Sequence, residues 1–547
     1  MFHVKTDPKF QEKYYKTTQS VCPECLTTID AQIFEDDGKV FIRKTCEKHG
    51  QYQDILSSNA DYYRWTHWRG DTWGWEKIGD VNPPDMECKN ERGCPWNCGL
   101  CSEHLSTCTL VIIEITNRCN LSCNFCYANV EKTGKLIEPS LEEIERIMDH
   151  FRKKPIPATS IMFSGGEPSL RSDLLDIVKM AKDKGFKEIL LATNGYAFQR
   201  PKSAEYARKC RENGLDTLYL SFDGVHDETW KITRGIPLKA YKERVIENCR
   251  KGGLDSIVLV TTIAKTVNDV EIGNIIQYAI DNIDLIRGIV FQPISLCGRV
   301  SHEEVNSLRI TNADVIKVIE KQTNGSLKVE RDWYPLSTIV EFGRAIAWLG
   351  DQEPIEFTCH PDCGFATYLV LDPDENKMNS VLEYMDPMAV IDYANRFWQK
   401  LKDKKSSRFF SKLADASWTG FAKMLDNGLG WLDKQQLKAR FALGLLPFIR
   451  KPGKLMKIFT KMILTGNWDN VSSFAYGSLL IGSMHFQDAY NFDIQRAKRC
   501  IVHFGIAMPD KTISEIPFCV MNIFRREEIE QQIAVPYLKS QEVTEIE

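Results

Sequence analysis

Cysteine spacing constrains the fold of this chain more than any other feature of its sequence. Eleven of the 18 cysteines fall between positions 22 and 126, in short C-x2-C and C-x3-C-x2-C groups. Thiols at these spacings converge on one point, as the ligands of a zinc ion or an iron–sulfur cluster do. The N-terminal segment, MFHVKTDPKFQEKYYK, is polar and has no signal-peptide pattern. We therefore expect a cytoplasmic protein whose cysteines bind metal rather than form disulfides.

Length, charge and hydropathy narrow the class of protein further. The 547 residues are enough for roughly two to four domains. The net charge of −4 gives no global reason to expect a nucleic-acid partner. No run of about 18 or more apolar residues is present, so a membrane-spanning helix is not expected.

An alternation of strands and helices is predicted from residue 109 to about residue 293. Six apolar runs have the length and composition of buried strands: 109–115, 159–163, 188–192, 217–221, 256–262 and 288–291. Helical patterns lie between them, which is typical of a parallel sheet with right-handed crossovers. We predict an α/β fold with a partial (β/α)6 barrel over residues 109–295. Its functional site should lie at the carboxyl ends of the strands.

The motif EITNRCNLSCNFCYA stands at the end of the first of these strands. Three of its thiols are suited to bind three irons of a [4Fe–4S] cluster and leave the fourth iron open: Cys119, Cys123 and Cys126. A structural zinc knuckle is the alternative. Further motifs end the later strands in order: FSGGEP at 163–168, ATNG at 192–195, SFDG at 221–224 and FQP at 291–293. Their position at successive strand ends favours the catalytic cluster over the knuckle.

This set of motifs resembles the radical SAM superfamily. The resemblance implies that the open iron chelates S-adenosylmethionine (SAM) and that an electron passed through the cluster cleaves SAM to a 5′-deoxyadenosyl radical. It also implies that the turn of FSGGEP holds the SAM amino group, with the carboxylate facing an ammonium. The residues that it assigns to cofactor binding are Phe125, Gly165, Gly166, Glu167, Pro168, Asn194, Ser221, Asp223 and Gln292.

A second C-x3-C-x2-C group, GCPWNCGLC, precedes the barrel in the segment 81–108. It is not followed by a GGE turn, so we assign it to an auxiliary [4Fe–4S] cluster. The predicted ligands are Cys94, Cys98, Cys101 and Cys108. Cys88 and His104 are rivals for the fourth position, and a structural zinc is the alternative.

Two further metal sites are predicted. Four dispersed thiols form a second auxiliary [4Fe–4S] cluster or a zinc site, with local pairs or buried free thiols as the alternative: Cys359, Cys363, Cys500 and Cys519. His360 and His503 are expected to hydrogen-bond rather than ligate. A mononuclear Fe or Zn site is predicted in an N-terminal module over residues 1–80, on Cys22, Cys25, Cys46 and His49.

The three remaining thiols with an interpretation lie in or after the barrel. Cys210 and Cys249 fall in helical patterns and are expected to be ordinary buried thiols. Cys297 follows the sixth strand. It is interpreted either as a thiol that contacts substrate or a cluster, or as an ordinary buried thiol.

The C-terminal region, 296–547, is predicted to be mostly helical and to carry a basic stretch at 400–461. That stretch has 15 lysines and arginines against four aspartates, with apolar residues interleaved. This pattern is typical of amphipathic helices on an anionic membrane surface. A core helix pair with a solvated basic rim is an equal alternative, and a nucleic-acid surface is a third reading.

The whole arrangement of cysteine groups resembles the archaeal tetraether lipid synthase family and its relatives that form lipid rings or methylate pterins. The resemblance implies a long-chain phospholipid substrate, C–C bond formation between saturated chain ends, peripheral binding at the inner face of the membrane, and a reductant such as ferredoxin or flavodoxin. Methylation of a small heterocycle such as a pterin, lipid ring formation and peptide modification remain alternatives. A multicluster electron carrier is the non-enzymatic alternative.

Overall fold

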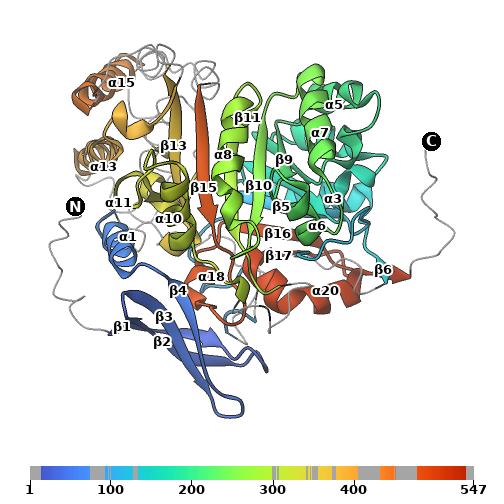
Figure 1. Cartoon of the computed structure of the whole chain (residues 1–547), viewed down its shortest axis with the longest axis horizontal. Helices are drawn as coiled ribbons and strands as arrows, with labels where there is room; N and C mark the ends of the chain where they lie inside the picture. Colours follow the sequence, from blue (N-terminus) through green and yellow to red (C-terminus); the bar gives the residue numbers. More distant parts are fainter. Residues whose placement is uncertain are drawn as a thin grey trace.

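The fold is that of a computed structural model of the chain (Figure 1). The structure describes residues 14–73, 93–96, 98, 100–126, 134–154, 156–297, 304, 307–340, 343–344, 347, 355–372, 377–404, 431–448, 450 and 477–536. Cys88, the predicted domain boundary at residue 80 and most of the basic stretch at 400–461 lie outside these residues.

A 12-stranded sheet forms the centre of the molecule. Six of its strands are parallel neighbours and match the predicted runs: β5 (Leu110–Thr116), β7 (Ser160–Gly165), β8 (Glu188–Thr193), β9 (Thr217–Ser221), β10 (Ile257–Ile263) and β11 (Ile286–Pro293). The helices that connect them pack against this sheet: α3 (Leu141–Arg152), α4 (Leu174–Asp183), α5 (Ser203–Glu212), α6 (Asp227–Arg234), α7 (Lys239–Gly252) and α8 (Ile272–Asp281). The predicted α/β fold is confirmed.

Strands from the C-terminal region extend the sheet at both edges. β15 (Ser478–Met484) runs parallel to β11, and β13 (Gly364–Asp372) pairs with β15 in the antiparallel direction. At the opposite edge, β16 (Val502–Ala507) runs parallel to β5 and is followed by the antiparallel β17 (Ile513–Pro517). The sequence predicted the helices of this region but not these strands, because short apolar runs do not reveal their partners.

Side chains of the barrel strands alternate between two environments, as the two-residue period of a strand requires. In β5, Val111, Ile113 and Ile115 are fully buried in the main hydrophobic core. The intervening residues of the same strand, including Ile112 and Glu114, face a cavity. One face of each strand therefore stabilises the fold, and the other lines the interior of the barrel.

The N-terminal residues form a separate antiparallel sheet below the barrel (Figure 1). Its four strands are β1 (Tyr14–Val21), β2 (Thr28–Asp36), β3 (Lys39–Cys46) and β4 (Gly50–Ser57). The side chain of Thr18 donates to Asp493 Oδ1 at 2.7 Å, and Lys44 Nζ donates to the carbonyl of Ala489 at 2.7 Å. These buried polar contacts attach the module to the segment that follows β15.

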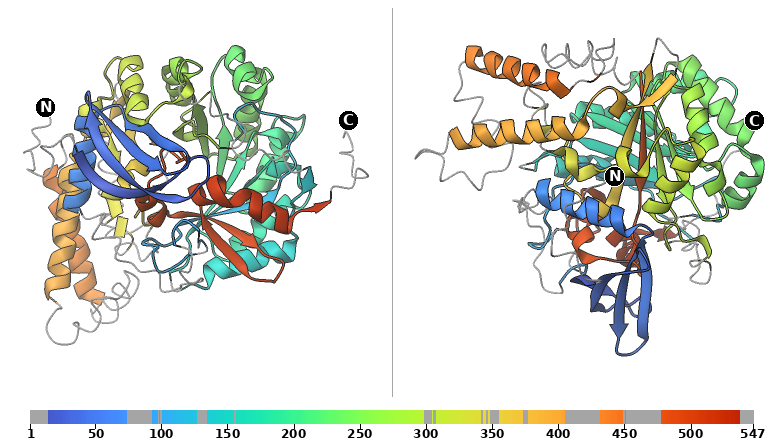
Figure 2. Two further views of the ribbon diagram at one scale, coloured as in Figure 1. Left: turned by 90° about the horizontal axis from the view of Figure 1, so that it is seen from below. Right: turned by 60° about the vertical axis from the view of Figure 1, so that its left-hand side comes forward.

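Two helices near the basic stretch lie side by side, away from the N-terminal sheet (Figures 1 and 2). α13 (Pro387–Lys404) and α15 (Trp431–Leu445) are joined by aromatic contacts, with Phe397 and Phe441 ring centroids 4.9 Å apart. Phe441 lies in the basic stretch and Phe397 just before it, so apolar side chains pack between these two helices. Among the residues that the structure describes, no helix combines the length and hydropathy needed to cross a membrane.

Candidate active site

The three predicted ligands of the primary cluster lie on the loop that follows β5: Cys119, Cys123 and Cys126. The last turn of α6 holds this loop in place. The backbone N–H groups of Asn124 and Phe125 donate to the carbonyl of Thr233 at 3.1 and 3.4 Å. All three thiols line the same cavity, so one loop presents them to one space. This donor set fits a [4Fe–4S] cluster with one open iron.

Burial and a neighbouring arginine determine the charge state of the cluster-loop thiols. Burial is the main cause that raises the pKa of the Cys119 thiol to about 12. A thiol in such surroundings becomes a thiolate when a metal ion supplies the compensating charge. One guanidinium nitrogen of Arg234 lies 3.7 Å from Cys123 Sγ, within hydrogen-bond reach of sulfur.

The two glycines of FSGGEP allow the end of β7 to touch the cluster loop. The N–H of Gly166 donates to the carbonyl of Thr116 at 2.8 Å. A Cβ placed on Gly165, whose φ is +130°, would come within 2.0 Å of that carbonyl oxygen, and one on Gly166 would come within 2.3 Å of the Arg118 oxygen. Any larger residue would push the strand end away from the cysteines.

Glu167 acts differently from the expectation that its carboxylate faces the SAM ammonium. The side chain is fully buried and accepts hydrogen bonds from the Ser169 N–H at 3.0 Å, the Thr193 hydroxyl at 2.6 Å and the Asn194 N–H at 2.7 Å. The carboxylate thus ties the ends of β7 and β8 together. The turn at Gly165 and Gly166 therefore faces the cavity, and the Glu167 carboxylate does not.

Asn194 and Ser221 are joined by a lysine that the sequence did not single out. Lys242 Nζ donates to the carbonyl of Asn194 at 2.7 Å and to Ser221 Oγ at 3.2 Å. Its side chain is almost completely buried, and burial, followed by the nearby Arg234, lowers the pKa of Lys242 to about 7. Lys242 therefore fixes the strand ends at which SAM contacts are expected.

Asp223 is buried behind the cavity wall and holds Arg234. Its carboxylate accepts two hydrogen bonds from the Arg234 guanidinium at 2.5 and 3.0 Å and one from the N–H of Thr262 at 3.2 Å. Asp223 thus positions the guanidinium against the Cys123 sulfur. Arg234 has no motif of its own in the sequence, and its role becomes visible only when α6 packs against the loop.

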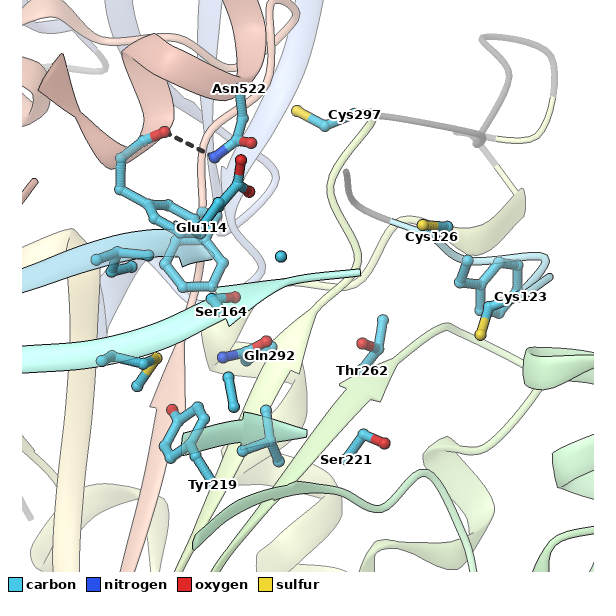
Figure 3. A pocket seen from close by; sticks show the side chains of 18 of the residues that line it. Glu114, Cys123, Cys126, Ser164, Tyr219, Ser221, Thr262, Gln292, Cys297 and Asn522 are labelled. Carbon is cyan, nitrogen blue, oxygen red and sulfur yellow. Dashed lines mark hydrogen bonds between the residues drawn. The ribbon is translucent and has the colours of Figure 1, made fainter. Parts of the chain in front are cut away.

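A cavity of about 320 Å³ occupies the carboxyl end of the barrel. Nine predicted residues line it: Cys119, Cys123, Phe125, Cys126, Gly165, Gly166, Asn194, Ser221 and Gln292. Its walls also include residues without a predicted role: Glu114, Ser164, Tyr219, Arg234, Thr262, Phe504, Phe518, Asn522 and Arg526. Figure 3 shows Cys123 and Cys126 at one end of this space, and Glu114 and Asn522 at the other.

Cys297 is buried and lines the same cavity. Figure 3 shows its sulfur on the wall between the cysteine end and Asn522. This position fits both readings, because Cys297 is a buried thiol that also faces the cavity. Cys210 and Cys249 are fully buried in α5 and α7, as expected, and burial raises the pKa of Cys210 to about 12.

The N-terminal sheet brings its four predicted ligands together. Their ligand atoms, from Cys22, Cys25, Cys46 and His49, all lie within 4.8 Å of one another. Cys22 Sγ and Cys46 Sγ each lie 3.5 Å from His49 Nδ1. Hydrogen bonds from Thr27 lower the pKa of Cys25 to about 6, which favours the thiolate that a metal requires. This geometry fits a tetrahedral mononuclear ion.

The structure places the predicted ligands of the first auxiliary cluster in two neighbourhoods. Cys94 lies close to Cys98, whose side chain is the main cause of the lowered pKa of Cys94. The ligand atom of Cys108 instead lies within 4.8 Å of His503 and Glu515. His503 in turn contacts Cys500, a predicted ligand of the second auxiliary site. Cys108 as the fourth ligand of the first auxiliary cluster therefore stays a prediction.

The second auxiliary set converges from distant parts of the chain. Burial, and next the neighbouring thiols of Cys363 and Cys500, raise the pKa of Cys359. The pKa of Cys500 is raised by burial and then by Cys519. His503 agrees with its expected hydrogen-bonding role, because its Nε2 lies 2.9 Å from the carbonyl of Cys500. Four neighbouring thiols, of which Cys359 is buried and the other three are half-buried, suit a closed cluster.

Comparison with known proteins gives matches over both the barrel and the N-terminal sheet. The family model described as "Radical SAM superfamily" matches residues 113–279, and that described as "HMPTM N-terminal zinc ribbon domain" matches residues 14–58. The chain is 39% identical over 521 residues to the 7,8-dihydro-6-hydroxymethylpterin dimethyltransferase of Methanocaldococcus jannaschii. The aligned residues cover 95% of this chain and 96% of that protein.

Other similarities are confined to part of the chain. A probable GTP 3′,8-cyclase of Methanothermobacter thermautotrophicus is 30% identical over 190 residues, with 34% of this chain and 56% of that protein covered. The solved structure of SuiB from Streptococcus suis superposes with a TM-score of 0.33 at 16% identity, and covers 40% of this chain and 47% of that chain.

The superfamily model and the M. jannaschii match confirm the superfamily and correct the finer resemblance. The relative that matches over nearly its full length is a pterin dimethyltransferase rather than a tetraether lipid synthase. The cysteine groups alone did not separate the two, because both resemblances rest on the same spacing. The chain is a radical SAM enzyme, of a superfamily that works with a [4Fe–4S] cluster and SAM, and it belongs to the same family as the M. jannaschii dimethyltransferase.

Proposed function

We propose that this enzyme methylates a reduced pterin by radical chemistry. The observation that carries the proposal is the 39% identity over 521 residues to a 7,8-dihydro-6-hydroxymethylpterin dimethyltransferase. The match extends beyond the barrel into the N-terminal sheet and the C-terminal strands that complete the cavity. When bound, the cluster and SAM would supply a 5′-deoxyadenosyl radical that takes a hydrogen atom from a pterin carbon and leaves as 5′-deoxyadenosine. A second SAM would donate the methyl group and leave as S-adenosylhomocysteine, with the electrons supplied by the reductant.

The cavity supports a small substrate over a phospholipid. Its volume of about 320 Å³ lies at the lower end of the range for small-molecule pockets, roughly 300–1,000 Å³. Polar side chains stand at the end away from the cysteines, among them Glu114 and Asn522, where a lipid chain end would require an apolar wall. The carboxyl ends of β9, β10 and β11 present Ser221, Thr262 and Gln292 toward the space between.

The residues around this cavity have different roles. Asp223, through Arg234, holds the cluster loop, while Lys242 and Glu167 fix the strand ends around SAM. The aromatic rings of Phe504 and Phe518 provide an apolar wall against which a heterocycle can pack. A reductant is required as for other radical SAM enzymes, and a ferredoxin or flavodoxin is the class of donor proposed.

The proposal is tested by expressing the chain anaerobically in a host that makes 6-hydroxymethyl-7,8-dihydropterin. Extracted pterins, after oxidation, should show mass increases of one and two methyl groups by mass spectrometry. The variant Cys123→Ala, which removes one cluster ligand, is the matched control and should give unmodified pterins. Membrane lipids from the same cells provide the opposing result: new joined or cyclised chains beside unchanged pterins would reject pterin methylation in favour of lipid chemistry.

A further inference from the structure

One end of the cavity carries a charge cluster that none of the sequence motifs predicts. Glu114 lies on the cavity face of β5, next to the apolar Ile112 of the same face. Arg526, at the start of α20 (Arg526–Ile533), donates to the two carboxylate oxygens of Glu114 at 3.0 and 2.8 Å. The side chains of Glu114 and Arg526 are only 24% and 12% exposed. A carboxylate in this place therefore faces the cavity rather than bulk solvent.

The same guanidinium organises two more side chains. Arg526 donates to Asn522 Oδ1 at 3.1 and 2.7 Å and to Glu530 Oε1 at 3.1 Å. Asn522 Nδ2 in turn donates to the carbonyl of Phe518 at 2.8 Å. Figure 3 shows the Asn522 amide beside the Glu114 carboxylate on one wall. The contacts of Arg526 fix the positions of both groups before any ligand binds.

The hydrogen-bond capacity of Glu114 exceeds what Arg526 uses. A carboxylate has about four lone-pair sites, and Arg526 occupies one on each oxygen. The side of Glu114 that faces the cavity is thus an acceptor that favours an N–H donor.

Next to this acceptor lies an aromatic wall. The rings of Phe504 and Phe518 are stacked with centroids 5.3 Å apart, and Phe486 lies 4.5 Å from Phe518. All three line the cavity together with Glu114. Arg526 Cζ lies 5.7 Å from the centroid of the Phe504 ring, so this apolar wall adjoins the guanidinium that holds Glu114.

We propose that Glu114, positioned by Arg526, selects the substrate by accepting a hydrogen bond from an N–H on the edge of a planar heterocycle. This inference rests on the proposed function and names a residue that recognises the pterin. The pyrimidine ring of a pterin offers two such donors, the 2-amino group and the N3–H. Lipid chains offer none, and an oxygen-only ring edge would leave the carboxylate facing an acceptor.

The test is equilibrium binding of 6-hydroxymethyl-7,8-dihydropterin to the reconstituted holoenzyme with SAM present. Two analogues remove one donor each: the N3-methyl and the 2-dimethylamino derivative. At least one analogue should bind the natural protein about tenfold or more weakly, as expected when a charged acceptor loses its donor. In Glu114→Ala and Glu114→Gln, the dissociation constant of that analogue should exceed that of the parent pterin by only about threefold or less.

Glu530→Gln is the matched control, because Glu530 pairs with the same guanidinium but does not belong to the cavity lining found here. It should keep the discrimination of the natural protein. Iron content and SAM binding of each variant show that it is folded. Equal discrimination in the natural protein and both Glu114 variants would overturn the assignment while leaving pterin methylation in place. If Glu530→Gln lost as much discrimination as Glu114→Gln, the assignment would also be overturned. Failure of the natural holoenzyme to bind the parent pterin would instead reject the proposed function itself.

Discussion

Arg234 lies between Asp223 and Cys123, with one guanidinium nitrogen 3.7 Å from the sulfur and two others on the carboxylate. The carboxylate fixes the direction of the guanidinium, and the guanidinium then places positive charge beside a predicted cluster ligand. Hydrogen bonds to ligand sulfur are one of the ways in which a protein tunes a cluster's reduction potential.

Replacing this arginine should lower the reduction potential of the primary cluster. In Arg234→Gln the thiolate of Cys123 loses a positive donor, so the more negative reduced cluster becomes harder to form. A redox titration followed by electron paramagnetic resonance should give a more negative midpoint, and Arg234→Lys should recover part of the shift. The exposed Arg244, changed to Gln, is the control and should leave the midpoint unchanged. An unaltered midpoint in Arg234→Gln would contradict this role.

Gly166→Ala should separate the end of β7 from the cluster loop. The new Cβ would lie 2.3 Å from the carbonyl oxygen of Arg118, and relieving such overpacking costs about 1–3 kcal/mol. We expect 5′-deoxyadenosine formation from SAM to fall by about tenfold or more, measured by chromatography under reducing conditions. Gly482→Ala is the control, because its nearest atom would be 3.6 Å away. Comparable activity in the two variants would show that the close approach is not needed.

Cys46→Ala should remove about one metal ion per chain. Its thiol is one of four ligand atoms that lie within 4.8 Å of one another, and three ligands hold such an ion less tightly. Elemental analysis should show the loss, and limited proteolysis should begin in the N-terminal sheet, since bound metal contributes folding free energy. Cys210→Ala, which removes a buried thiol outside the metal sites, should keep the full metal content. Full metal content in Cys46→Ala would contradict the assignment.

Lys242 should make the stability of the protein depend on pH above neutrality. Burial lowers the pKa of Lys242 to about 7 in the folded protein, whereas an unfolded lysine has a pKa of about 10.4. Between these values the unfolded chain binds more protons, so the free energy of unfolding rises with pH by up to ~1.4 kcal/mol per unit. Below about pH 7 both states are protonated and this contribution is flat.

The check is anaerobic denaturant unfolding from pH 6.5 to pH 9. Lys242→Met should lose the rise that the natural protein shows, while Lys239→Met, at an exposed position, should retain it. The same slope in all three proteins would mean that Lys242 does not titrate in this range.

Local spacing in the sequence was sufficient to find the cluster loop and the metal site of the N-terminal sheet. Ligands three or four positions apart are brought together by the covalent geometry of a short turn. For this reason Cys119, Cys123 and Cys126, and likewise the pair Cys22 and Cys25, could be grouped before any fold was known. The six parallel strands were equally accessible, because buried strands leave uninterrupted apolar runs.

Tertiary structure alone decided which side chains face the cavity. Glu167 belongs to a motif, yet its carboxylate turns into the protein and binds Thr193 and Asn194. Glu114 was visible as a lone charge in an apolar strand, but its partner Arg526 lies 412 positions away. Spacing along the chain cannot predict such a contact, because it depends on how β16 and α20 pack beside β5.

The convergence of the distant cysteines has the same origin. The sequence prediction grouped Cys359, Cys363, Cys500 and Cys519, but spacing supported only the first two, and the packing of the C-terminal segments brings the distant thiols to them. The sequence by itself determined which short segments can bind metal and which can form the barrel. The three-dimensional packing of remote segments, driven by burial of their apolar faces, determined how those parts share one site.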